Sequence, residues 1–270
     1  MDAFRDGILE GKVAYIAGGS SGINLGIAQR LASQGAAVAI VSRSGDKVEA
    51  AVKSITDAGG RAFGWPADVR DYAAVEASLA ATRDKFGEID VVVSGAAGNF
   101  LAPVLGMSAN AFKTVVDIDL IGTFNVFRAC YQFLKKPGAS LIAITAGQGT
   151  HPMMFQAHAC AAKAGINLLT KCLAMEWGPA GVRVNAISPG PIAETEGMAR
   201  LAAAPGAEAA IKGRIPLRDY GSKRDIADMA LYLASDSAGY ITGAILDVDG
   251  GSSLGDASMN ALDVRQERRL

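Results

Sequence analysis

The sequence has little net charge, few aromatic residues, few cysteines and no long hydrophobic run. Its formal net charge is −1 and its Lys and Arg residues are scattered, which excludes the basic surface typical of nucleic-acid binding. No apolar stretch reaches the ~20 residues that span a bilayer, and the polar start predicts no secretory signal. The three cysteines lack metal-ligand spacing, so we expect no metal site, reduced thiols and a cytoplasmic protein.

Half of the 270 residues are hydrophobic and 32 are glycine, enough for one large buried core. Apolar runs typical of buried strands alternate with segments of helical periodicity along the chain. Strands are predicted from Val13 onward and at Ala37–Val41, Ala62–Trp65, Ile89–Val93, Leu141–Thr145, Val182–Ile187 and Ile245–Val248. Helices are predicted at Lys47–Ala58, Asp71–Phe86, Ala109–Tyr131, Phe155–Trp177 and Asp225–Ala234. This alternation predicts an α/β fold, a Rossmann-like doubly wound parallel sheet of about seven strands, in a single domain over residues 1–270.

The stretch after the first strand combines a small-residue turn with the start of a helix. Ser20 and Ser21 lie between Gly18 and Gly22, and Ile23 begins the apolar stripe of the helix. The free N–H groups of a helix's first turn favour an anion, and glycine lets the backbone approach a pyrophosphate closely. This pattern predicts a dinucleotide site formed by these five residues; the alternative is an ordinary strand–helix turn.

The type of residue at the end of the second predicted strand indicates whether the cofactor is NAD or NADP. An acidic residue there hydrogen-bonds the ribose of NAD, whereas an arginine accommodates the 2′-phosphate of NADP. This chain has Arg43 and Ser44 at that point and no acidic residue before Asp46. A guanidinium fork and a hydroxyl both suit phosphate. We therefore predict NADP(H) as the cofactor, the alternative being that Arg43 is a solvated loop charge.

The spacing Gly18-x-x-x-Gly22 resembles the cofactor loop of the short-chain dehydrogenase/reductase family. Asn24 stands where this family usually has a third glycine, and we expect it to keep the turn because Asn tolerates unusual backbone angles. Residues 94–98 resemble the family's Asn-Asn-Ala-Gly segment but contain neither Asn. The resemblance implies further cofactor contacts: Asp68 and Val69 at the adenine, Ala96, Ala97 and Gly98 along the adenosine, Pro189, Gly190 and Ile192 beside the nicotinamide, and Thr195.

The residues of the family's usual carbonyl chemistry are changed in this chain. Members of the family use Ser, Tyr and Lys, with an Asn on the preceding long helix. Lys163 matches the lysine, and Asp119 stands where the Asn belongs. Ala146 and Ala159 replace the Ser and the Tyr. His158 lies about 100° around the helix from Ala159, a poor position for replacing the tyrosine, and we expect a partly buried histidine with satisfied hydrogen bonds.

Four segments, residues 96–101, 110–119, 174–179 and 189–197, resemble a subgroup of the family, the peroxisomal-type 2,4-dienoyl-CoA reductases. That subgroup lacks the tyrosine and has Asp and Lys as its catalytic pair, which implies Asp119 and Lys163 here. NADPH would reduce the δ carbon of a conjugated thioester, and a water held by Asp119 would protonate carbon. Lys163 would bind the nicotinamide ribose. The alternatives are a salt bridge within one helix for Asp119 and cofactor binding alone for Lys163.

The resemblance also implies how an acyl-CoA substrate binds. Phe100 and Leu101 would face the acyl chain, and Arg200 would meet the CoA phosphates. Arg200 lies in an insert, Pro191–Arg214, that we predict to be a substrate lid, the alternative being a surface helical hairpin. The family forms tetramers through its two long helices, so a homotetramer is expected. The polar tail, Gly255–Leu270, is either a frayed end or a contact with a neighbouring subunit.

The sequence thus favours an enzyme, an NADP-dependent oxidoreductase that reduces 2,4-dienoyl-CoA to an enoyl-CoA in the β-oxidation of unsaturated fatty acids. Two alternatives stay open. One is another enoyl- or 3-oxoacyl-thioester reductase, although a 3-oxoacyl substrate needs a carbonyl proton donor that Ala159 does not supply. The other is a non-catalytic NADP-binding sensor or scaffold, which would bind the cofactor without turnover.

Overall fold

The computed structural model describes residues 4–201, 204 and 206–259. Seven strands form one parallel sheet in the order β3-β2-β1-β4-β5-β6-β7. The strands are β1 (Val13–Ala17), β2 (Ala37–Ser42), β3 (Arg61–Pro66), β4 (Val91–Ser94), β5 (Ser140–Ile144), β6 (Arg183–Pro189) and β7 (Ile245–Val248). This is the predicted Rossmann-like sheet, and its strand order reverses between β1 and β4. Ligands of such sheets bind beyond the carboxyl ends of the strands at this point.

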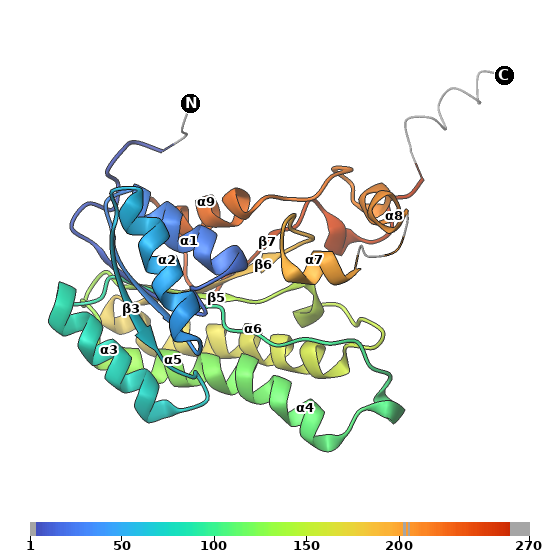
Figure 1. Ribbon diagram of the computed structural model, residues 1–270, viewed down its shortest axis with the longest axis horizontal. Helices are drawn as coiled ribbons and strands as arrows, with labels where there is room; N and C mark the ends of the chain where they lie inside the picture. The colour runs from blue at the N-terminus through green and yellow to red at the C-terminus, as the bar shows by residue number, and fades with distance from the viewer. Residues whose placement is uncertain (1–3, 202–203, 205, 260–270) are drawn as a thin grey trace.

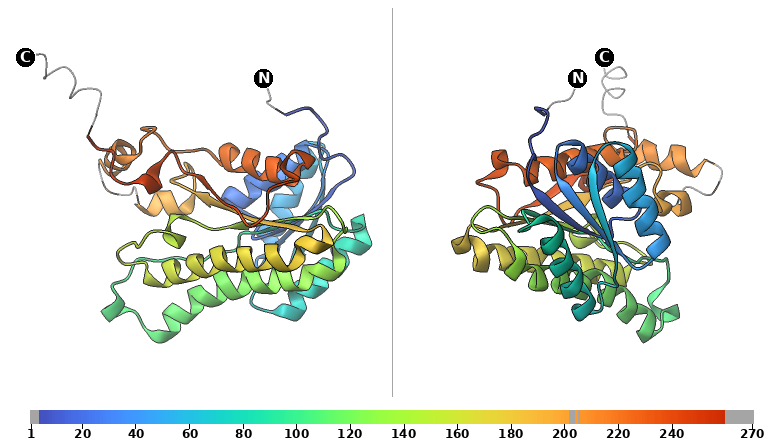
Figure 2. Two further views of the ribbon diagram at one scale, coloured as in Figure 1. Left: turned by 180° about the vertical axis from the view of Figure 1, so that it is seen from behind. Right: turned by 60° about the vertical axis from the view of Figure 1, so that its left-hand side comes forward.

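Helices cover both faces of the sheet (Figure 1, Figure 2). On one face lie α1 (Gly22–Ser33), α2 (Gly45–Asp57) and α9 (Lys223–Ala234); on the other lie α3 (Tyr72–Phe86), α4 (Ala109–Val116), α5 (Gly122–Cys130) and α6 (Ala157–Trp177). Each face of the sheet forms a hydrophobic core with the helices that cover it, and side chains alternate between the two cores along a strand. In β1, Ala14 and Ile16 enter the core beneath α1, α2 and α9, and Tyr15 enters the core on the other face. Both faces of the sheet are packed against helices, so the loops at its carboxyl edge start from rigid strand ends.

The predicted helix Ala109–Tyr131 departs from a continuous α-helix at one place. A π-helical turn, η2 (Asp117–Ile121), separates α4 from α5, and the Gly122 N–H bonds to the Asp117 carbonyl. A π turn holds one more residue than an α turn and often marks a functional site. Asp119 lies in this turn and is buried. The hydrophobic pattern continues through the segment, which is why the sequence predicted no interruption.

The insert Pro191–Arg214 contains two short helices, α7 (Glu196–Leu201) and α8 (Ala207–Arg214), which lie beyond the end of β6 (Figure 1). An isolated parallel bridge between Ile192 and Gly221 ties the start of the insert to the loop before α9. Of the predicted tail, residues 260–270 lie outside the described residues. Within the part of the chain that the structure describes, no helix is long and apolar enough to cross a membrane.

Candidate active site

The glycine loop after β1 is so close to its neighbours that a side chain cannot fit at its first position. Gly18 has a φ of 77° and Gly22 a φ of 58°, in the left-handed region that favours glycine. A Cβ on Gly18 would lie 2.7 Å from the backbone nitrogen of Ala96. The Ser42 hydroxyl at the end of β2 donates to the Ser20 hydroxyl at 2.7 Å. The loop is therefore joined both to β2 and to the segment after β4.

The first turn of α1 is open to an anion. Ser21 is the N-cap, but its side chain makes no capping hydrogen bond, and the first turn contains no acidic residue. Gly22 and Ile23 begin the helix, as predicted. The unpaired N–H groups and the helix dipole remain available to a pyrophosphate. Together with the tight glycine loop, this arrangement fits a dinucleotide cofactor.

Asn24, expected to adopt unusual backbone angles, is an ordinary helical residue of α1. The turn is kept, as expected, but Gly18 and Gly22 rather than Asn24 supply its left-handed conformations. The Asn24 side chain instead makes long-range contacts. Its Nδ2 donates to the Gly95 carbonyl at 2.7 Å and, more weakly, to the Gly18 carbonyl at 3.4 Å. One amide thus links the glycine loop to the loop after β4.

Arg43 and Ser44 are exposed at the end of β2, directly after the serine that contacts the glycine loop. A second arginine, Arg70, follows β3, and its Nη2 lies 2.6 Å from Asp68 Oδ2. The hydrogen bond from Arg70, with a smaller contribution from the charge of Arg43, holds the pKa of Asp68 below its ordinary value. The sequence pattern did not single out Arg70, although it follows Asp68 by two positions. Because Asp68 pairs with Arg70, the excess positive charge at these strand ends comes from Arg43.

The remaining predicted cofactor contacts lie at the same edge of the sheet. Val69 follows β3, Ala96, Ala97 and Gly98 follow β4, and Pro189, Gly190, Ile192 and Thr195 end or follow β6. Gly190 passes close to the segment after β7, since a Cβ there would lie 2.5 Å from the Cα of Asp249. Thr195 Oγ1 donates to the Ile192 carbonyl at 2.8 Å and accepts from the Met198 N–H at 3.3 Å. This threonine therefore fixes the start of α7.

Asp119 and Lys163 form a buried ion pair between two helices. Lys163 Nζ lies 3.1 Å from Asp119 Oδ2, and the residues are 8% and 1% exposed respectively. Asp119 Oδ1 accepts the Gly98 N–H at 2.8 Å, and Lys163 donates to the Ile144 carbonyl at 3.1 Å. The pair thus joins the π turn, the loop after β4, α6 and the end of β5. Charges that are shielded from water interact strongly with charge that develops beside them.

The sequence left open that Asp119 makes a salt bridge within its own helix, but the structure shows that a neighbouring residue makes that bridge. Asp117 pairs with Lys113, four residues earlier, whereas Asp119 pairs across to α6. Ala159 is buried in α6, and Ala146 follows β5. Neither alanine carries a hydroxyl, so the ion pair stands without the two donors that carbonyl reduction uses in the family.

His158 differs from the partly buried, satisfied histidine that the sequence predicted. It is 0% exposed, and neither ring nitrogen has a hydrogen-bond partner among the described residues. Its ring centroid lies 4.3 Å from that of Phe100. Burial lowers the pKa of His158, and the charge of the Asp119 carboxylate partly offsets this effect. The prediction was wrong because the loop that carries Phe100 comes from a distant part of the sequence.

Two exposed apolar loops lie beside this cluster. The first contains Phe100, Leu101, Val104 and Leu105, and the second contains Met153, Met154 and Phe155. The Ala102 N–H donates to the Phe155 carbonyl at 2.9 Å, which joins the two loops. Clustered large apolar side chains mark a binding surface. Phe100 and Leu101, which the resemblance assigned to the acyl chain, lie in the first loop, whereas no sequence signal singled out the second loop. The side chain of Arg200 lies outside the described part of the chain.

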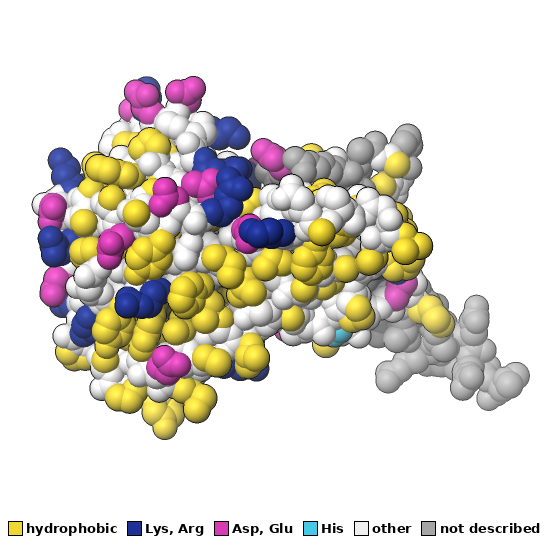
Figure 3. Space-filling view, turned by 90° about the horizontal axis from the view of Figure 1, so that it is seen from below, with side chains coloured by type: hydrophobic (Ala, Val, Ile, Leu, Met, Phe, Trp, Pro, Cys, Tyr) yellow, Lys and Arg dark blue, Asp and Glu magenta, His cyan; other side chains and the backbone are white. Residues whose placement is uncertain are grey.

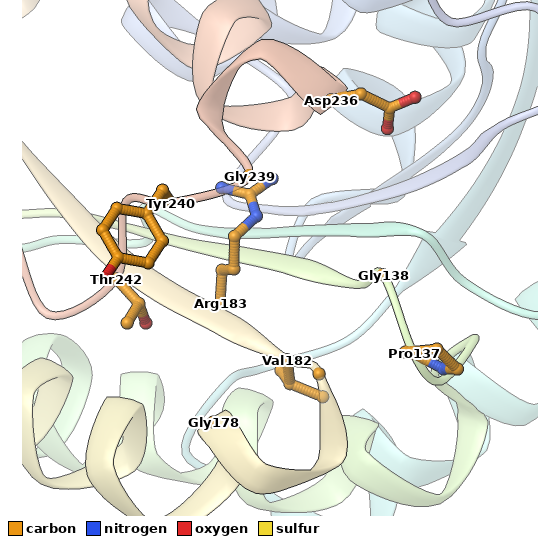
Figure 4. A pocket seen from close by; sticks show the side chains of 10 residues that line it. Pro137, Gly138, Gly178, Val182, Arg183, Asp236, Gly239, Tyr240 and Thr242 are labelled. Carbon is orange, nitrogen blue, oxygen red and sulfur yellow. The ribbon is translucent and has the colours of Figure 1, made fainter.

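A surface pocket elsewhere on the molecule contains none of the predicted site residues (Figure 4). It is lined by Pro137, Gly138, Gly178, Gly181, Val182, Arg183, Asp236, Gly239, Tyr240 and Thr242. Arg183 is the first residue of β6, at the amino edge of the sheet. Its guanidinium donates to the Leu233 carbonyl at 2.7 Å, and burial lowers its pKa. The pocket therefore lies at the end of the sheet opposite to the Asp119–Lys163 pair.

Comparison with known proteins shows relatives over most of the chain. A family model described as enoyl-(acyl carrier protein) reductase matches residues 17–253. The chain is 43% identical over 253 residues to the peroxisomal 2,4-dienoyl-CoA reductase of Saccharomyces cerevisiae, described as (3E)-enoyl-CoA-producing; the match covers 92% of this chain and 86% of that protein. It is 44% identical over 254 residues to the protein of the same description from Rattus norvegicus, with coverage of 92% and 86%.

Solved structures share the fold. A short-chain dehydrogenase/reductase from Serratia marcescens superposes with a TM-score of 0.84 at 33% identity, over 91% of this chain and 99% of that chain. An actinorhodin polyketide ketoreductase solved with NADPH gives 0.84 at 28% identity, over 90% and 97%. The chain belongs to the short-chain dehydrogenase/reductase family and is an oxidoreductase with a nicotinamide cofactor. Within that family it is similar to the 2,4-dienoyl-CoA reductases, as the sequence resemblance implied.

Proposed function

We propose that the protein is an NADPH-dependent 2,4-dienoyl-CoA reductase that forms a (3E)-enoyl-CoA. The observation that carries this proposal is the buried Asp119–Lys163 pair in a site where Ala146 and Ala159 replace the usual hydroxyl donors. Reduction of a ketone needs a proton donor at the carbonyl oxygen, which these alanines do not supply. Reduction of a dienoyl thioester ends with a proton on carbon, which a water held by a carboxylate can supply. The similarity to 2,4-dienoyl-CoA reductases over 92% of the chain supports the same substrate.

NADP(H) is the nicotinamide cofactor that these residues fit best. When bound, it supplies the hydride. Gly18, Gly22 and the first turn of α1 would hold the pyrophosphate, because they combine a close backbone approach with unpaired N–H groups. Arg43 would meet the 2′-phosphate, and the end of β2 offers no acidic residue to the ribose before Asp46.

Asp119 and Lys163 would have different roles in the reaction. Negative charge develops on the thioester oxygen during the reduction, and the Lys163 ammonium, which is held by Asp119 and by the Ile144 carbonyl, stabilises it. Asp119 orients a water that gives its proton to carbon, and the hydroxide left behind takes up a proton from the solvent. The Gly98 N–H fixes one oxygen of the carboxylate. Lys163 also binds the nicotinamide ribose.

The two apolar loops would hold the acyl part of the substrate. Phe100 and Leu101 form one wall, and Met153–Phe155 forms the other. The insert Pro191–Arg214 would close over the CoA part as a lid on the single domain, with Arg200 on the phosphates. With the acyl chain on the apolar loops and the CoA part under the insert, the thioester would lie beside the Asp119–Lys163 pair.

The test compares two acyl thioesters of equal chain length under the same conditions. Loss of NADPH absorbance is measured with a 2,4-dienoyl-CoA and with a 3-oxoacyl-CoA. We expect turnover of the dienoyl-CoA and at least about 100-fold slower turnover of the 3-oxoacyl-CoA, because Ala159 supplies no carbonyl proton donor. Faster turnover of the 3-oxoacyl-CoA would reject the proposal in favour of a ketoreductase. Binding of NADPH without turnover of either substrate would favour a sensor or scaffold.

We also propose that the protein is a homotetramer assembled through its long helices. Large hydrophobic side chains are exposed along these helices: Phe112 of α4, Ile121 of the π turn, Phe124 of α5, and Leu168 and Met175 of α6. Figure 3 shows the molecule from below, the side on which these helices lie, with many hydrophobic side chains on its surface. Extended apolar surface of this kind is typical of a contact between subunits.

A further inference from the structure

We infer that Asn24 is a positioning residue that holds two loops of the cofactor cleft at a fixed separation. This inference rests on the proposed nicotinamide cofactor and deepens it. Asn24 lies in the first turn of α1 and is 8% exposed. Its Nδ2 donates to the Gly95 carbonyl after β4 at 2.7 Å and to the Gly18 carbonyl after β1 at 3.4 Å. A single side chain therefore ties the helix that receives the pyrophosphate to both loops beside it.

The position opposite Asn24 must be glycine for this contact to form. A Cβ on Gly95 would lie 2.3 Å from Asn24 Oδ1 and 2.4 Å from its Nδ2. Gly95 has no left-handed φ, so its backbone does not itself require glycine, and the requirement is space for the amide.

The hydrogen bonds of Asn24 argue against a role in packing alone. Two carbonyl oxygens face Nδ2, and this fixes the orientation of the amide. The other amide atom, Oδ1, is buried and has no hydrogen-bond partner among the described residues. An unmet buried acceptor costs free energy, so packing by itself would not favour asparagine over glycine at this position.

The same contact connects the cofactor loops to the proposed catalytic pair. Gly95 stands three residues before Gly98, whose N–H binds Asp119 at 2.8 Å. The loops also touch directly, because Gly18 approaches the backbone after Gly95 too closely to carry a side chain. Loss of the Asn24 amide would leave the backbone hydrogen bond from the Gly95 N–H to the Ala17 carbonyl, at 3.1 Å, but the separation of the two loops beyond that bond would be less well fixed. The pyrophosphate would then lie differently with respect to Asp119.

The experiment is a double-mutant cycle in which NADPH affinity is measured by fluorescence titration and stability without cofactor by urea unfolding. Asn24→Gly is expected to weaken NADPH binding about 5- to 10-fold, the effect of one or two lost hydrogen bonds. Gly95→Ala in the wild-type background is expected to weaken binding at least as much, because its methyl group meets the Asn24 amide. In the Asn24→Gly background the same methyl group finds free space and should cause no further loss.

Two results would overturn the inference. One is an Asn24→Gly variant with a lower free energy of unfolding but wild-type NADPH affinity, which would make the role structural only. The other is an equal effect of Gly95→Ala in both backgrounds, which would mean that the two positions do not interact. These measurements use no acyl substrate. Failure of the wild type to reduce a 2,4-dienoyl-CoA would instead reject the proposed function and leave the inference about the cofactor cleft unaffected.

Discussion

Single residues at the carboxyl edge of the sheet differ in how firmly the structure holds them. Asp119 and Lys163 are buried and paired, and each has a further hydrogen bond to the backbone. Arg43 is exposed at the end of β2 and can turn toward a ligand. In the proposed function the buried pair determines the reaction, and the exposed arginine determines the choice of cofactor.

Arg43→Asp is expected to shift cofactor preference from NADPH toward NADH by one to two orders of magnitude. A hydrogen bond to a charged group contributes about 1.5–3 kcal/mol, and the new carboxylate suits the free ribose hydroxyls of NADH. The measurement is kcat/KM with each cofactor. Arg61→Asp makes the same charge change at the amino end of β3 and should leave the preference unchanged. Equal use of both cofactors by the wild type would contradict the assignment of Arg43.

His158 is expected to make stability depend on pH. Burial lowers its pKa in the folded protein, whereas the unfolded chain keeps the ordinary value of about 6.5. Below that pH the unfolded state binds a proton that the folded state does not, so the free energy of unfolding falls as pH drops. Urea unfolding between about pH 7 and about pH 5 should show a smaller loss in His158→Gln than in wild type. His151→Gln, which removes the exposed histidine, should match wild type, and an unchanged pH dependence in His158→Gln would contradict the assignment.

At the scale of elements, hydrophobic periodicity and turn glycines predicted the sheet and the helices that cover it. The strand expected at Ile89–Val93 begins only at Val91, because Ile89 makes an isolated bridge with Leu134 instead. The candidate pair could be predicted because each residue occupies a position that the family uses. The π turn and the burial of His158 could not, since both depend on contacts between segments far apart in the sequence.

Gly122 begins α5 directly after the π turn, and its lack of a side chain keeps that turn close to Val69. A Cβ on Gly122 would lie 2.6 Å from Cγ2 of Val69. Gly122→Ala is therefore expected to lower the free energy of unfolding by about 1–3 kcal/mol through overpacking and to weaken NADPH binding. Gly178→Ala places the same methyl group in open space on a helical backbone and should be neutral within about 0.5 kcal/mol in urea unfolding. Equal stability of the two variants would contradict this account of the turn.

At the scale of the whole molecule, the exposed apolar face over α4, α5 and α6 predicts self-association. Light scattering of the wild type is expected to give a mass about four times the 27.7 kDa of the chain. Leu168→Glu places a charge where a 64% exposed leucine stands on α6, and it should lower that mass. Ala50→Glu adds the same charge to α2 on the opposite face and should not. A stable monomer of the wild type at low concentration would rule out the tetramer.

The compartment of the protein stays a prediction. Cys130, Cys160 and Cys172 are free thiols in the structure, and the cytoplasmic location was predicted from such thiols. The relatives from Saccharomyces cerevisiae and Rattus norvegicus are described as peroxisomal. Fractionation of the cells that produce the protein would decide between the two compartments.

Asp119→Asn tests most directly whether the Asp119–Lys163 pair carries the reaction. The substitution keeps the shape of the side chain and restores the amide that the family usually has, so NADPH affinity is expected to stay near that of wild type. Turnover of a 2,4-dienoyl-CoA at saturating NADPH is expected to fall by a factor of about 10² to 10⁴, the contribution of a general acid–base group. Lys163→Ala should lower NADPH affinity as well, because Lys163 is proposed to contact the ribose.

Adding Ala159→Tyr to Asp119→Asn completes this measurement. Turnover of the dienoyl-CoA should not recover, because the proton goes to carbon and not to a carbonyl oxygen. Low turnover in both variants, with NADPH affinity retained in Asp119→Asn, is the predicted result. Wild-type turnover in Asp119→Asn would contradict the claim that this carboxylate is catalytic.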